Sequence, residues 1–186
     1  MSTTTIIVLI FAIAALGLAA FLYYQKRRSE RLHGRFGPEY ERTVNEFGDR
    51  RKAESELERR ARRVERFHIR DLTPEERDRF AEAWRADQAR FVDEPEQAVG
   101  DAHRLVNEVM HERGYPVSSE FEQNAADLSV EHPLVVEHYR AACAIAGKRD
   151  EGRVDTEDLR KAMVHYRALF EDLLGAPVHH REEVRR

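Results

Sequence analysis

A glutamate and a histidine supply the spacing in this chain that best suits metal chemistry. Glu108 and His111 stand three residues apart in the segment EVMH, so both side chains lie on one face of a helix. This spacing is half of the ligand set that holds a di-iron centre in four-helix proteins. A complete set needs a second such pair on another helix, and Glu137 and His138 are adjacent instead. We therefore predict no metal site, and keep a membrane-bound metal-carboxylate enzyme using Glu108 and His111 as an alternative.

The single thiol and the short catalytic signatures give no stronger candidate. The motifs HExxH, CxxC, GxSxG, GxxxxGK[ST] and GxGxxG do not occur in the chain. Cys143 is the only cysteine, which excludes an internal disulfide and fits a reducing compartment. It stands on the apolar face of a predicted helix, where a small core residue is the expected role. We predict no catalytic residue, no cofactor and no enzymatic activity.

Positive charge gathers on one side of the longest apolar run. Residues 6–24 contain 18 aliphatic or aromatic residues and one glycine. As a helix they would span roughly 28 Å, which matches the hydrocarbon core of a bilayer. Aromatic residues and then basic residues flank the C-terminal side of this run: Tyr23, Tyr24, Lys26, Arg27, Arg28 and Arg31. The pattern predicts one transmembrane helix that contacts the lipid bilayer through residues 6–24.

The order of charge and apolar residues predicts the orientation of that helix. A cleaved signal peptide carries its positive charge before the apolar core, whereas here the uncharged segment MSTTT comes first and the charge follows. Cleavage after Ala20 would also leave the apolar Phe21 and Leu22 at the new N-terminus. The positive-inside tendency then places residues 1–5 outside the cell membrane and residues 25–186 in the cytoplasm.

Charge divides the predicted cytoplasmic part into a basic and an acidic portion. Residues 29–70 carry 12 Lys/Arg and 9 Asp/Glu, net +3, whereas residues 71–186 carry 16 and 26, net −10. Nucleic-acid binding needs clustered positive charge, so the acidic portion disfavours it. The basic residues between positions 50 and 63 alternate with glutamates. They are interpreted either as a solvated helix or as a surface for anionic lipid, in which case the chain would be a lipid-surface sensor.

Helical periodicity runs through the cytoplasmic part. Gly37 and Pro38 break the helix that leaves the membrane. Apolar residues at intervals of three and four then predict one long helix over 39–67, within a basic juxtamembrane region of residues 25–70. No alternating pattern typical of a strand occurs.

Apolar stripes and capping residues predict a helical domain over residues 71–175. Thr73, Pro74 and Glu76 are typical of a helix start, and Phe80 and Trp84 follow on one face. Gly175 ends the last helix, and the charged segment 176–186 is predicted to be frayed. The expected fold class is all-α, with one N-terminal transmembrane helix, a long juxtamembrane helix and a compact bundle of about five helices.

Six distinctive stretches lie between Arg35 and Leu174: RFGPEYERTV, GDRRKAESEL, FAEAWRADQARFVDEP, RLVNEVMHERGYPV, FEQNAADLSVEHPLVVEHYRAA and TEDLRKAMVHYRALFEDLL. Together they resemble a group of uncharacterised bacterial single-span membrane proteins. The resemblance implies a bacterial origin and carries no functional residues. With the anchor and the helical domain, it leads us to expect a single-pass bacterial membrane protein. We expect its cytoplasmic domain to be an interaction or scaffolding module for a protein partner.

Overall fold

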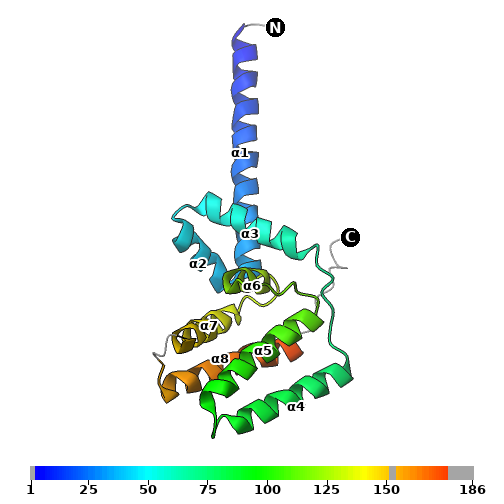
Figure 1. Cartoon of the computed structure of the whole chain (residues 1–186). Coiled ribbons are helices and arrows are strands. Elements are labelled where there is room, and N and C mark those ends of the chain that lie inside the picture. Colours follow the sequence, from blue (N-terminus) through cyan, green and yellow to red (C-terminus); the bar gives the residue numbers. More distant parts are fainter. Residues whose placement is uncertain (1–2, 151–153, 176–186) are drawn as a thin grey trace. The chain divides into compact units, whose positions relative to one another are not determined.

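The computed structural model of the chain describes the backbone of residues 3–150 and 154–175, and the side chains of residues 11–148 and 154–175. Within these ranges the chain forms eight helices and no strand (Figure 1), which confirms the predicted all-α class. The predicted frayed tail, residues 176–186, lies outside the described residues, as do residues 1 and 2 of the predicted outer segment. Residues 1–58 and 59–186 form two compact units.

The first unit begins with one long helix. Helix α1 covers Thr3–Phe36 without a break, so it includes both the apolar run and the basic residues that follow it. As predicted, the helix stops at Gly37, whose φ of 48° is in the left-handed region that favours glycine. Pro38 then occupies the first turn of helix α2 (Pro38–Phe47), where its missing N–H costs nothing.

The prediction of one long helix over residues 39–67 was wrong. The structure divides this segment into α2 and helix α3 (Arg50–Val64). Gly48 takes a left-handed φ of 62° and its N–H donates to the carbonyl of Val44, which ends α2. The carboxylate of Asp49 then accepts from the backbone N–H of Lys52 and so caps the start of α3. The prediction used the spacing of apolar residues, which carries no information about these two capping residues.

From residue 11 to residue 24, where side chains are described, the apolar part of α1 is exposed on all sides. The side chains of Phe11, Ile13, Leu16, Leu18, Phe21, Leu22, Tyr23 and Tyr24 are each 52% to 72% exposed. A search restricted to the described residues finds no helix that combines the length and apolar character needed to cross a membrane. The predicted span starts at Ile6, and the side chains of residues 6–10 lie outside the described set.

The second unit holds the five helices expected between residues 71 and 175. They are α4 (Pro74–Arg90), α5 (Pro95–Glu112), α6 (Phe121–Leu128), α7 (Val136–Asp150) and α8 (Thr156–Gly175). Helix α8 packs against α5 and α7, while α4 packs against α5 (Figure 1). Thr73 and Glu76 form the predicted capping box at the start of α4. Trp84 stacks on Phe170 with 4.9 Å between ring centroids, so the predicted apolar face of α4 is core.

Candidate functional site

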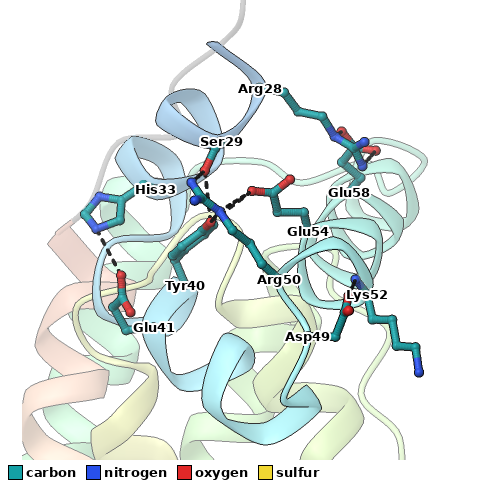
Figure 2. A network of polar contacts seen from close by, with 10 residues as sticks. All are labelled: Arg28, Ser29, His33, Tyr40, Glu41, Asp49, Arg50, Lys52, Glu54 and Glu58. Atoms are coloured by element: carbon teal, nitrogen blue, oxygen red, sulfur yellow. Dashed lines mark hydrogen bonds and ion pairs between the residues drawn. The ribbon is translucent and has the colours of Figure 1, made fainter. Parts of the chain in front are cut away.

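Four polar side chains from three helices meet in the first unit, and we call them the Tyr40 network: Ser29, Tyr40, Arg50 and Glu54 (Figure 2). The hydroxyl of Tyr40 donates to Oε1 of Glu54 over 2.9 Å. Because its proton is used there, this hydroxyl accepts from Ser29, with 3.0 Å between the two oxygens. Both Tyr40 and Glu54 are buried, so the contact satisfies polar atoms that water does not reach.

Arg50 closes the network from the first turn of α3. Its Nε donates to the Tyr40 hydroxyl over 3.0 Å and to Oε1 of Glu54 over 3.2 Å. Its Nη2 also donates to the hydroxyl of Ser29 on α1. The hydrogen bond with Tyr40, foremost among these interactions, raises the pKa of Arg50 above its ordinary value. The guanidinium is therefore charged at every physiological pH, and its direction is fixed by three partners.

A second arginine joins α1 to α3 in the same unit. Arg28 donates from Nε and Nη2 to the two carboxylate oxygens of Glu58, over 2.7 and 2.9 Å (Figure 2). This two-point contact is the strongest geometry available to an arginine and a carboxylate. Both side chains are about 30% exposed, so water screens part of the attraction. Arg28 thus has a structural partner as well as its predicted place beside the apolar run.

Residues of α1, the turn residue Asp49 and the start of α3 line a pocket of about 610 Å³, which we call the α1–α3 pocket. It is lined by one apolar side chain, two uncharged polar ones, four cations and two carboxylates: Leu22, Gln25, Ser29, Lys26, Arg28, Arg50, Arg51, Asp49 and Glu54. Its cations outnumber its carboxylates, so the pocket can hold an anion. None of its residues is an activated nucleophile.

The remaining predicted flanking residues lie on the exposed surface of α1. Tyr23 and Tyr24 are both more than half exposed. The guanidinium of Arg27 lies over the Tyr23 ring, 5.4 Å from its centroid. Lys26 makes one exposed contact with Glu30 at 3.8 Å, and Arg31 is exposed. Of the six predicted residues, only Lys26 and Arg28 line the α1–α3 pocket.

Glu108 and His111 lie in a different hollow, in the second unit. This α4–α5 groove has a volume of about 770 Å³ and an apolar floor that includes Phe80, Ala83 and Leu105. Glu108 accepts from Arg104 over 3.2 Å, an ion pair that a metal ligand would have to give up. In the described part of the chain, no three histidine, cysteine, aspartate or glutamate side chains are grouped closely enough to hold a metal ion.

Two more pairs in the chain share the Glu-x-x-His spacing of Glu108 and His111. They are Glu30 with His33, and Glu65 with His68. His33 lies 3.6 Å from Glu41, a residue of the neighbouring helix α2. The spacing alone is therefore a weak indication of metal binding.

Two further side chains of the second unit, His103 and Cys143, contact its core. Nδ1 of His103 and the hydroxyl of Tyr166 are hydrogen-bonded over 3.0 Å, which directs this imidazole toward α8. Cys143 packs against the core, as the sequence predicts. Burial raises the pKa of its thiol to about 11, which suppresses the nucleophilic thiolate.

Sequence reasoning missed most of the residues that build the first unit. The partners Tyr40 and Glu54 are 14 positions apart, and Arg28 and Glu58 are 30 apart. Within the Tyr40 network, only the contact of Arg50 with Glu54 follows the four-residue spacing that a helix pattern reveals.

The comparisons with known proteins add no relative. The chain matches no family model, no curated protein and no solved structure. The resemblance to bacterial single-span membrane proteins therefore stays a prediction, and the class given by the fold is all-α.

Proposed function

We propose that the chain is a single-pass bacterial membrane protein whose cytoplasmic helical domain is an interaction module. Helix α1 anchors it through residues 6–24, with the N-terminus outside. The observation that carries this proposal is the exposure of the apolar α1 surface, where Leu16 is 71% and Leu18 is 60% exposed. Such a surface is unfavourable in water and favourable in hydrocarbon, because every backbone polar group is satisfied inside the helix.

The polar side of the first unit fits the same role. Lys26 and Arg27 follow Tyr23 and Tyr24 directly, so aromatic and basic residues come where the apolar surface ends. The Tyr40 network and the ion pair between Arg28 and Glu58 then tie α1 to α2 and α3. The anchor is thereby joined to a folded unit through packed polar contacts.

The α4–α5 groove supplies a surface for a partner in the second unit. Its rim charges already pair with one another, Arg104 with Glu108 at 3.2 Å and Arg79 with Glu112 at 3.7 Å. The floor is apolar, so the partner feature that it fits is an uncharged apolar segment of another protein. A photocrosslinker at Ala83 in intact cells should then capture one defined protein, and the same group at the exposed Val92 should not. Equal capture at the two positions would remove this groove from the proposal.

Alkaline carbonate extraction of membranes tests the anchor. The wild-type chain should stay in the membrane pellet, as should a Leu16→Ile, Leu18→Ile variant. A Leu16→Arg, Leu18→Arg variant should be released, because each arginine near the centre of a span costs about 2.5–3.5 kcal/mol. Release of the wild-type chain, or retention of the arginine variant, would contradict the proposal.

A further inference from the structure

We propose that the α1–α3 pocket binds the phosphate of an anionic phospholipid headgroup, with Lys26 and Arg51 as its ligands. This inference rests on the proposed function, because the membrane position of α1 is what brings a lipid to the pocket. The pocket begins at Leu22 and continues to Ser29, so it straddles the point where the apolar surface of α1 ends. For a membrane-spanning α1, this is the level of the phosphate groups.

Two of the four cations that line the pocket have close hydrogen-bonded partners in the described chain, and the other two do not. Arg50 is held by Tyr40 and Glu54, and Arg28 by Glu58. Among the residues that the structure describes, Lys26 has only the exposed contact with Glu30 at 3.8 Å, which solvent screens. The Arg51 side chain has no hydrogen-bond or ion-pair partner among the described residues. These two exposed cations are therefore left for an anion.

The two carboxylates of the pocket already have hydrogen-bond partners within the fold. Oε1 of Glu54 accepts from Tyr40 and Arg50 (Figure 2), and the Glu54 side chain is buried. Asp49 is turned to the N–H of Lys52 and caps α3. The carboxylates are engaged in holding the fold, so an incoming phosphate meets Lys26 and Arg51.

The side chains that form the walls of the pocket have fixed positions, unlike the charges of a diffuse basic surface. Arg50 is fixed by three hydrogen bonds and Arg28 by two, whereas Leu22 supplies an apolar edge on the side of the bilayer. A phosphodiester can lie between Lys26 and Arg51 while its acyl chains follow α1 past Leu22. A volume of about 610 Å³ is within the range of small-molecule sites.

Native mass spectrometry of the full chain in detergent tests this site. The probes are phosphatidylglycerol and phosphatidylcholine, added separately. The wild type should retain phosphatidylglycerol preferentially, and a Lys26→Gln, Arg51→Gln variant should lose that preference by about tenfold. A matched control, Arg31→Gln with Lys52→Gln, removes the same charge from side chains outside the pocket and should change it by less than about twofold. Lys52 points away from the Tyr40 network (Figure 2). Arg51→Lys, which keeps the charge, should retain most of the preference.

The outcomes separate the pocket from its alternatives. An equal loss in the two double variants would mean diffuse attraction and overturn the site, as would no loss in either. Glycerol 1-phosphate at millimolar concentration should not displace the lipid; full displacement would assign the site to a free phosphate ester and overturn a lipid ligand. Since the measurement is made in detergent, it does not depend on the anchor. Release of the wild-type chain by carbonate would overturn the proposed function while leaving the lipid preference measurable.

Discussion

The hydroxyl of Tyr40 on α2 donates a hydrogen bond to Oε1 of Glu54 on α3 over 2.9 Å, and both side chains are buried. The two helices are separated only by Gly48 and Asp49, so this bond fixes how the chain turns between them. It also connects them to α1, because the same hydroxyl accepts from Ser29. A polar contact thus organises the unit that adjoins the proposed anchor.

Replacing Tyr40 by phenylalanine should loosen this unit. Tyr40→Phe keeps the ring but removes the donor to Glu54, and we expect α2 and α3 to lose about 1–3 kcal/mol of local stability. Hydrogen exchange of the full chain, measured by mass spectrometry, should show faster exchange in both helices. Tyr24→Phe, which alters an exposed tyrosine, is the control and should leave exchange in α2 and α3 unchanged. Equal exchange in all three proteins would contradict the account of the Tyr40 network.

Gly114 is a position where only glycine fits. Its φ is +93°, and an added Cβ would collide with the carbonyl oxygen of His68. We expect Gly114→Ala to destabilise the second unit by about 2–4 kcal/mol, through backbone strain and this clash. Urea unfolding followed by the fluorescence of Trp84, the only tryptophan, measures the loss.

The matched control for Gly114 is Gly147 in α7. An added Cβ there meets no atom within 4 Å, and its φ is ordinary. Gly147→Ala should stabilise the unit by about 0.5–1 kcal/mol, since alanine is the better helix former. A similar effect of the two alanines would show that the structure around Gly114 is wrong.

The helices of the second unit follow from local signals in the sequence, whereas the arrangement of the first unit does not. Thr73 and Glu76 are three residues apart and form the capping box that their types predict. In contrast, Gly48 and Asp49 sit inside an interrupted apolar stripe, where the stripe favours one helix and the capping residues end it. The spacing of apolar side chains reports which residues share a helix face, but it does not show that one glycine adopts a left-handed conformation. The predicted long helix was therefore wrong.

The candidate site was only partly visible in the sequence for a related reason. The basic flank, with Lys26 and Arg28, is predictable because its residues are consecutive and directly follow the apolar run. Glu58, which pairs with Arg28, and Arg51, which lines the same pocket, come from another helix, and their proximity to the flank depends on the turns at Gly37 and Gly48. Long-range pairs of this kind are set by tertiary structure and leave no pattern at helical spacing.

The thiol of Cys143 should be slow to react in the native protein. Burial raises its pKa to about 11. At pH 8 this leaves on the order of one hundredth of the thiolate that an ordinary exposed cysteine carries. Alkylation by iodoacetamide should therefore be at least about a hundredfold slower in the native chain than in urea. A cysteine placed by Val92→Cys in a Cys143→Ala background should react at the same rate in both conditions. Fast native alkylation of Cys143 would contradict its place in the core.

The second unit should lose stability as the pH falls below 7. Burial, followed by the charge of His138, lowers the pKa of His165 below its ordinary value of 6.5, and the two Nδ1 atoms lie 2.9 Å apart. The unfolded chain then binds the His165 proton more readily than the folded chain does. The stability that the neutral His165 gives the second unit is therefore fully present above pH 6.5. It is lost as the pH falls through the lowered pKa of His165 in the folded chain.

Urea midpoints between pH 8 and pH 5 measure this dependence. We expect the midpoint of the wild-type chain to fall more steeply toward acid than that of His165→Gln. The control His111→Gln changes an exposed imidazole in the α4–α5 groove and should keep the wild-type slope. A His165→Gln slope as steep as the wild type would refute the assignment to His165.

The central claim, that the apolar surface of α1 lies in hydrocarbon, is tested most directly by fluorescence quenching in vesicles with brominated acyl chains. The full chain carries a single reporter, introduced by Leu16→Trp in a Trp84→Phe background, and its control is Val92→Trp in the same background. Leu16 lies on the exposed apolar part of α1, and Val92 is 84% exposed in the second unit. The account predicts strong quenching of the reporter at position 16 and little at position 92. An unquenched reporter at position 16, or equal quenching at both positions, would contradict it.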